Sequence, residues 1–69
     1  MEYGMKELCK LEGFDNGLDL IQNYMDDGGC PGICTKCGIT YWVEHDHANG
    51  HCCCGSYTVQ SAFILMGII

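Results

Sequence analysis

The spacing of apolar residues predicts a short helix at the start of the chain. Met1, Met5, Leu8 and Leu11 recur at the interval of one helical face, and polar residues lie between them. Gly13 stands where this helix would end, because glycine accepts the left-handed backbone of a helix C-cap. A first helix that ends near Gly13 is therefore expected.

A second helix is predicted from about Gly17 to Met25, where Leu18 and Ile21 continue one apolar face. Asn16, followed three residues later by Asp19, resembles a capping box with the shorter acid. The Asp-Asp-Gly-Gly sequence that follows should end the helix. Acids at a helix C-terminus oppose its dipole, and paired glycines favour a flexible exit.

Alternating, β-branched and aromatic residues predict a strand over residues 39–43. The polar stretch 45–50 ends in Asn-Gly, a strong hairpin-turn signal. A short return strand is therefore expected around residues 51–52. Residues 57–59 are expected to add a third strand.

The final segment, residues 61–69, carries no charge. It is too short to cross a bilayer, which takes about twenty apolar residues, so the protein or a partner must bury it. Ser61 is suited to cap a short helix through Met66, with Gly67 ending it. A central strand with alternating faces is also compatible with the pattern, although the serine and glycine favour the helix.

The cysteines offer the stability that a short hydrophobic core does not supply. A chain of 69 residues buries roughly 60% of the surface that its unfolded form exposes, which leaves its core marginal. The odd count of seven cysteines and the run at residues 52–54 suit paired disulfides poorly. Residues 1–10 lack the apolar stretch of a signal peptide. These features favour reduced thiols that bind a metal, in the cytoplasm, which would be the host cytoplasm for a phage-encoded protein.

Cys34, Cys37 and Gly38 form a C-x-x-C-G turn, the usual half of a zinc site. The spacing brings both sulfurs to one side of a tight turn, and a positive φ at the glycine lets backbone N–H groups point at the thiolates. In the second half, Cys54 also precedes a glycine. We therefore expect Cys34, Cys37, Cys52 and Cys54 to bind one structural Zn²⁺ in a closed site.

The fourth ligand leaves alternatives open. His51 would restore the ordinary spacing to Cys54, and Cys53 could pair with either neighbour, although adjacent side chains of an extended chain point to opposite faces. Cys30 is a further substitute, but residues 31–32 between it and the first turn are interpreted as the entry to that turn.

Three other potential ligands are given structural roles. Cys9 is expected to be a small buried or half-buried hydrophobe of the first helix. His45 and His47 are expected to be solvated turn residues; with Glu44 or Asp46 they would form at most a weak second site.

The charge argues against a nucleic-acid interface. The net charge is −6 and only three residues are basic, whereas binding a phosphate backbone takes several Lys or Arg contacts. Four thiolates with one divalent cation would add about −2 more. An acidic surface instead suits docking on a basic protein partner.

From Pro31 onward, the chain resembles small uncharacterised zinc-ribbon proteins of bacteria, bacteriophages and plasmids. The resemblance lies in a P-x-I-C-x-x-C-G motif, an E-x-D before a G-x-C turn, a C-G-x-x-T-V-x-S-A motif and an apolar end. The matching positions are Pro31, Ile33, Cys34, Cys37, Gly38, Glu44, Asp46, Gly50, Cys52, Cys54, Gly55, Thr58, Val59, Ser61, Ala62, Leu65, Gly67 and Ile68, with Leu8, Gly13, Phe14 and Leu18 matching more loosely. This chain has His45 where a proline is usual, and its second cysteine turn is one residue shorter than C-x-x-C. The resemblance implies a zinc site and a ribbon fold, without an assigned activity.

These features predict one small α+β domain stapled by a metal. Its expected parts are a helical hairpin at residues 1–27, a zinc ribbon of two to three short antiparallel strands at 30–60, and a buried apolar segment at 61–69. The predicted function is non-enzymatic binding of another protein, as a monomer or small homo-oligomer and away from membranes. A rubredoxin-like mononuclear iron protein is the alternative, and a nucleic-acid-binding zinc ribbon is the third possibility.

Overall fold

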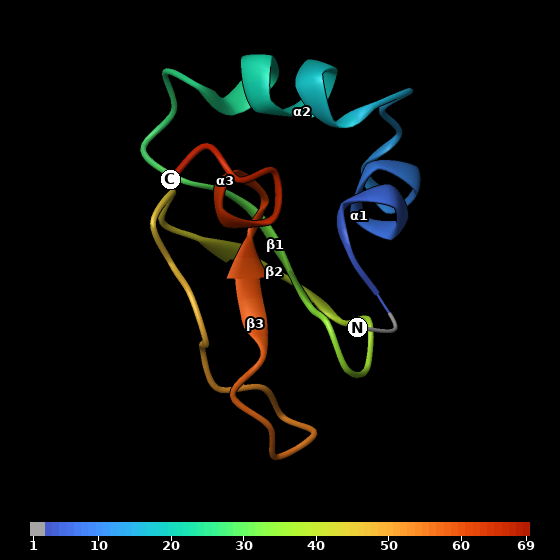
Figure 1. Ribbon diagram of the computed structural model, residues 1–69, viewed down its shortest axis with the longest axis vertical. Helices are drawn as coiled ribbons and strands as arrows, with labels where there is room; N and C mark the ends of the chain where they lie inside the picture. Colours follow the sequence, from blue (N-terminus) through green and yellow to red (C-terminus); the bar gives the residue numbers. More distant parts are fainter. Residues whose placement is uncertain (1–2) are drawn as a thin grey trace.

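Within residues 3–69, the fold consists of three helices and a three-stranded antiparallel sheet, which confirms the predicted small α+β class (Figure 1). The computed structural model describes residues 3–69, so the expected contribution of Met1 to the first helix lies outside the described residues. The elements are, in chain order, α1 (Met5–Glu12), α2 (Gly17–Tyr24), β1 (Cys30–Cys34), β2 (Thr40–Val43), β3 (Val59–Ser61) and α3 (Ala62–Leu65).

Helix α1 ends, and helix α2 begins, at the capping residue predicted from the sequence. Gly13 caps α1 with a φ of 84°, and its N–H donates to the Cys9 carbonyl. Asn16 caps α2, since its side chain accepts the Asp19 N–H at 3.0 Å. Met25, expected as the last helical residue, is the C-cap. Capping interactions within one helical turn therefore set the end of α1 and the start of α2.

The central strand β1 lies where the sequence indicated only the entry to a turn. Proline is rare in central strands because it cannot donate to the ladder. Here Pro31 lies opposite Trp42. The Cys34 N–H donates to the Ile39 carbonyl at 2.9 Å, so Cys34 and Ile39 form a hydrogen-bonded pair. Hydrogen-bonded and non-hydrogen-bonded pairs alternate along an antiparallel ladder, so Pro31 and Trp42 form a non-hydrogen-bonded pair. On its other side, β1 pairs with β3 only from Gly32 onward. The proline therefore interrupts no ladder hydrogen bond.

The return strand expected at residues 51–52 is wrong. The sheet order is β2-β1-β3, so β2 pairs with β1, and the chain that follows it turns at His45–Asp46 and not at the Asn-Gly pair. The Asn-Gly pair instead leads into a bridge of Gly50 with Val59, whose two N–H to carbonyl hydrogen bonds measure 2.9 and 3.1 Å. All of β1 is buried, so pairing with it removes more apolar surface from water than pairing with a polar return segment would. The third strand begins at Val59, two residues later than expected.

Two clusters of buried side chains form the core. The larger one joins the three helices to β1 and consists of Leu8, Cys9, Leu20, Ile21, Cys30, Ile33, Ala62 and Phe63. The smaller one consists of Cys34, Cys52 and Val59, with Tyr41 and Val43 packed against it. Cys9 is 5% exposed, which confirms its prediction as a buried hydrophobe.

The apolar C-terminal segment begins as a helix. The Ser61 hydroxyl accepts the Ile64 N–H at 3.1 Å, and Gly67 ends the helical segment with a φ of 77°. The first residues of α3 are buried, whereas Ile68 and Ile69 are 51% and 61% exposed. The prediction of a helix is confirmed, and the prediction of burial holds only for the first part of the segment.

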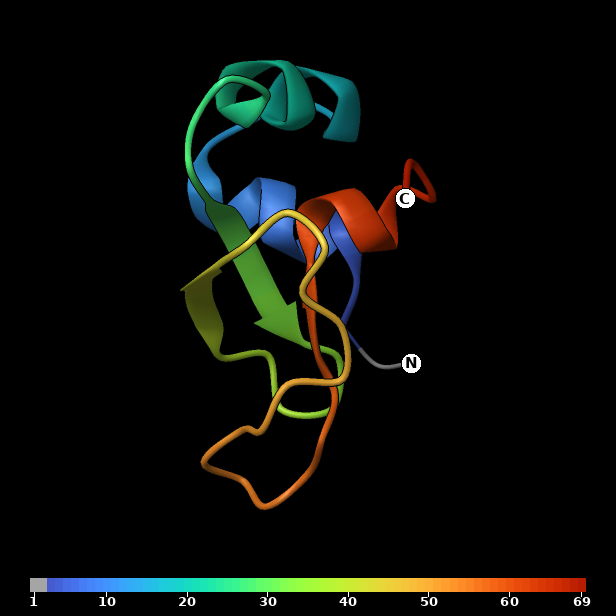
Figure 2. The ribbon, with the colours of Figure 1, turned by 90° about the vertical axis from the view of Figure 1, so that its left-hand side faces the viewer.

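The helices gather at one end of the molecule, and the loop between Gly50 and Val59 extends from the opposite end (Figures 1 and 2). The turn after β1 lies at that same end, so the fold brings the two cysteine-rich turns together. Within residues 3–69, none of the helices has the length and apolar character needed to cross a membrane.

Candidate metal centre

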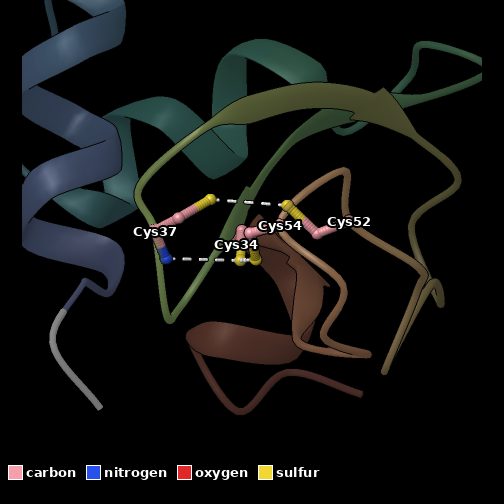
Figure 3. A group of neighbouring side chains, drawn as sticks. All are labelled: Cys34, Cys37, Cys52 and Cys54. Carbon is pink, nitrogen blue, oxygen red and sulfur yellow. Dashed lines mark hydrogen bonds between the residues drawn. The ribbon is translucent and has the colours of Figure 1, made fainter.

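Four sulfur atoms converge at the end of the sheet away from the helices. The Sγ atoms of Cys34, Cys37, Cys52 and Cys54 all lie within 4.8 Å of one another. The Cys37 and Cys52 sulfurs are 3.4 Å apart and those of Cys34 and Cys54 are 3.9 Å apart (Figure 3). Four sulfurs at about 2.3 Å from a tetrahedral Zn²⁺ would lie about 3.8 Å apart. The cluster therefore has the dimensions of a site that could hold one metal ion.

The first half of this cluster has the geometry that its sequence predicted. Cys34 is the last residue of β1, and the Gly38 N–H closes the following turn on the Cys34 carbonyl at 2.9 Å. Gly38 has a φ of 84°, a conformation that glycine adopts without steric cost. The turn directs the Cys37 N–H at the Cys34 sulfur, 3.4 Å away.

The second half shows how a C-x-C pair can contribute two ligands. The Gly55 N–H donates to the Cys52 carbonyl at 2.9 Å, and the Cys52 N–H donates to the Ser56 carbonyl at 2.9 Å. Gly55 has a φ of 92°. This tight turn brings the Cys54 sulfur to the other three sulfurs and leaves Cys53, between the two candidate ligands, exposed.

The three alternative ligands lie outside the cluster. His51 is exposed, and its ring lies 5.2 Å from the ring of Tyr57. Cys53 is exposed as well. Cys30 is buried in the helix-facing core, where burial raises the pKa of its thiol, and its sulfur lies 4.0 Å from the Glu44 carbonyl. Among residues 3–69, the four cysteines named above are the one group of three or more potential ligands close enough to share an ion.

Hydroxyl groups surround the sulfurs, and the sequence analysis did not identify them. Thr58 Oγ1 lies 3.1 Å from the Cys34 sulfur, Ser56 Oγ lies 3.0 Å from the Cys54 sulfur, and the two hydroxyls are 2.7 Å apart. The Tyr41 hydroxyl donates to the Cys52 sulfur at 3.3 Å and accepts the Cys53 N–H at 3.3 Å. The one indication of these hydroxyls in the sequence is that Ser56 and Thr58 lie within three residues after the second Cys-Gly pair.

These surroundings separate the proton affinities of the two thiols in the first turn. Burial raises the pKa of Cys34, but hydrogen bonds from Thr58, from the Cys37 and Lys36 N–H groups and from Ser56 outweigh it and lower the pKa to about 5. The Ile39 N–H lowers the pKa of Cys37, yet burial and the neighbouring sulfurs outweigh that bond and raise the pKa to about 12. These hydrogen bonds therefore favour the ionised form of the Cys34 thiol over that of the Cys37 thiol. A metal ion that binds all four sulfurs as thiolates would remove this difference between Cys34 and Cys37.

Two histidines expected to be solvated have structural contacts instead. The His45 ring lies 4.3 Å from the ring of Phe63, and its Nε2 is 3.0 Å from the Tyr24 carbonyl. The backbone carbonyl of His47 accepts the Ser61 N–H at 2.9 Å. Both side chains are half-buried, because the turn folds back over β3 and the start of α3.

No family model matches this chain, and neither a curated protein nor a solved structure matches it. The function is therefore inferred from the cysteine cluster and from the surfaces that the fold leaves open.

The Tyr41 hydroxyl provides a direct test of the hydrogen bonds around the cluster. Tyr41→Phe removes the donor to the Cys52 sulfur while keeping the ring in place, so we expect metal affinity to fall about tenfold. Competition with a chromophoric chelator measures this affinity. Tyr57→Phe is the matched control, because that exposed ring contacts His51 outside the cluster. Equal affinities of the Tyr41→Phe variant and the parent chain would contradict a role for this hydroxyl.

Proposed function

We propose that this chain is a zinc-ribbon protein in which one structural Zn²⁺ holds a protein-binding module together. The observation that carries the proposal is the convergence of four cysteine sulfurs from two turns that are distant in sequence. In this proposal, the helical hairpin at residues 1–27 packs on a ribbon at residues 30–60, in one domain. The resemblance to small zinc-ribbon proteins of bacteria, bacteriophages and plasmids supports it.

The ligand set favours a structural role over a catalytic one. Catalytic zinc sites have three protein ligands and keep one position for water or substrate, whereas four cysteines complete a tetrahedron. A closed site of this type is expected to be non-enzymatic. The hydroxyl and N–H donors around the sulfurs support a charged site, since they offset negative charge that a single divalent ion leaves uncompensated.

The surface supports a protein partner. The net charge is −6, which disfavours a phosphate backbone. Trp42 and Tyr57 are 62% and 66% exposed, and exposed aromatic rings are common anchors of protein interfaces. We therefore propose a cytoplasmic protein-binding role for the monomer or a small homo-oligomer.

Metal analysis tests the first part of this proposal. We expect one zinc per chain after purification without added metal, and a colourless protein that loses its fold when a strong chelator removes the ion. A red protein with one iron per chain would favour the rubredoxin-like alternative, since iron also binds four thiolates. A chain that stays folded in chelator without any metal would contradict a structural ion.

Partner capture tests the second part. The metal-loaded chain, immobilised through a tag, should retain a specific protein from a lysate of its source cells or host. A Cys34→Ser bait, which cannot form the site, should not retain it. Recovery of nothing above background by the metal-loaded bait would count against a protein-binding role.

A further inference from the structure

The two edges of the sheet differ in how they are closed. The outer edge of β3 is covered by residues 47–50 of the same chain. Val59 exchanges two backbone hydrogen bonds with Gly50, the Ser61 N–H donates to the His47 carbonyl, and the Gln60 side chain bonds to Asn49. Within residues 3–69, strand β2 pairs only with β1 and forms the other edge of the sheet.

The outward-facing groups of β2 follow from its register. Because the Cys34–Ile39 pair is hydrogen-bonded, the N–H and C=O groups of Tyr41 and Val43 point toward β1. Those of Thr40 and Trp42 point away from β1, toward the open edge. An edge of this kind is a template for an added strand, and proteins usually block it with lysine, proline or a covering loop. Residues 40–43 of this strand contain neither lysine nor proline.

The Trp42 side chain makes close contacts next to this edge strand. Its indole packs so closely over Gly29 that a Cβ on that residue would lie 2.6 Å from Nε1. Its ring meets Tyr24 edge-on at 5.5 Å, and Tyr24 in turn meets Phe14 at 6.1 Å. The side chain is nevertheless 62% exposed. A fixed, exposed aromatic ring loses little conformational entropy when it contacts a partner.

Carboxylates accompany this aromatic row. Tyr24 donates to the Glu12 carboxylate at 3.4 Å, and the Asp27 N–H bonds to the Tyr24 carbonyl at 3.2 Å. Burial and the charges of Glu12 and Asp27 raise the pKa of Tyr24. Asp26 precedes Asp27, and Glu44 directly follows β2. The chain's basic residues are Lys6 and Lys10 on α1 and Lys36 in the first cysteine turn. The surface beside β2 is therefore complementary to positive charge.

We propose that the free edge of β2 binds an extended, basic segment of a partner protein as an added fourth strand, with a lysine or arginine side chain over the Trp42 ring. Backbone hydrogen bonds to Thr40 and Trp42 would supply affinity. The cation over the aromatic face, near the carboxylates, would supply selectivity for basic sequences. This inference rests on the proposed protein-binding function and names its surface and partner class. A second copy of the chain fits this edge poorly, because each copy carries a net charge of −6.

Synthetic peptides test the proposal on the full, metal-loaded chain. One peptide alternates lysine with valine, a second replaces every lysine by glutamate, and a third contains the first composition interrupted by prolines. We expect the first peptide alone to change the fluorescence of Trp42, the single tryptophan, and to slow amide hydrogen exchange at Thr40 and Trp42. Its affinity should fall as salt rises. The absence of binding by the first peptide, or equal binding by all three, would overturn the proposal.

Variants locate the binding surface. Trp42→Ala should weaken binding of the basic peptide about tenfold or more by calorimetry, and Thr40→Lys should weaken it by placing a like charge at the edge. Tyr57→Ala is the matched control, since it removes an exposed ring whose aromatic contact is with His51 and not with Trp42; it should bind as the parent chain does. Retained metal content shows that each variant is folded. Unchanged binding by both β2 variants would overturn the proposed edge.

Two further outcomes separate this inference from the protein-binding function itself. If the Thr40→Lys and Trp42→Ala baits capture the same lysate partner as the parent chain, the module binds proteins but the edge of β2 is not the site. If the chain alone dimerises with exchange protection at Thr40 and Trp42, a second copy occupies the edge and the proposed occupant is wrong.

Discussion

Cys34→Ser is expected to abolish metal binding and leave the chain unfolded at room temperature. The Cys34 sulfur receives the Cys37 N–H and lies 3.1 Å from the Thr58 hydroxyl, so it is the most extensively hydrogen-bonded of the four sulfurs. Binding of structural zinc contributes about 10 to 16 kcal/mol of apparent free energy to folding. Folded domains have a total stability of about 5 to 15 kcal/mol, and a chain this short lies near the lower end of that range, so losing the metal would remove more than its stability.

Circular dichroism and elemental analysis of the purified variant measure both consequences. Cys53→Ser is the matched control, because it makes the same exchange at an exposed position between two proposed ligands. Cys9→Ser extends the control to the helix core. Both controls should retain one metal per chain, although Cys9→Ser should lower the unfolding free energy. Loss of metal from either control would show that the ligand set is wrong.

Gly32→Ala is expected to lower the unfolding free energy by about 1 to 3 kcal/mol, the usual range for overpacking a core. Gly32 lies in the middle of β1, between both neighbouring strands. A Cβ there would come within 2.7 Å of the Gln60 carbonyl oxygen and 2.8 Å of a Val43 methyl group. The Val43 methyl can rotate away, but the carbonyl belongs to the backbone of β3. The added methyl group must therefore push the two strands apart.

Chemical denaturation of the metal-loaded protein gives this free energy. Gly28→Ala is the control, since a Cβ at that exposed glycine would have no atom within 4 Å. It should leave the midpoint within experimental error or raise it slightly, because alanine restricts the unfolded chain. A destabilisation at Gly32 no larger than that at Gly28 would contradict the close approach of β3.

Local chemistry made the helical parts of this fold predictable. Asn16 and Ser61 each satisfy a backbone N–H three residues ahead, and Gly13 and Gly67 adopt the left-handed conformation that ends a helix. Each of these signals acts within one helical turn. No knowledge of the rest of the molecule was needed to interpret them.

The sheet depended on information that local patterns do not contain. Pro31 and Gly32 are poor strand residues by propensity, yet they are suited to β1. The proline faces no ladder partner that needs its N–H, and the glycine admits two close neighbours. The Asn-Gly signal did not produce the hairpin turn: the chain turns at His45–Asp46, and Gly50 bonds to Val59 and not to β2. Pairing was therefore decided by the burial of the whole of β1.

The candidate metal centre was also predictable only in part. Cysteine spacing identified all four members of the cluster, because chelation requires ligands on one side of a tight turn. The spacing did not reveal Tyr41, which reaches the Cys52 sulfur from β2, nor the Ser56 and Thr58 hydroxyls near the other sulfurs. Ordinary polar residues become partners of the site only through the fold.

The central position of β1 also has a consequence for synthesis on the ribosome. Its partner β3 and the Phe63 side chain of the core are translated after all four clustered cysteines. The thiols therefore leave the exit tunnel before the strand that completes the sheet and the Thr58 hydroxyl that contacts the Cys34 sulfur. An ion bound by the four cysteines would therefore gain the Thr58 contact of Cys34 only after this later part of the chain has emerged.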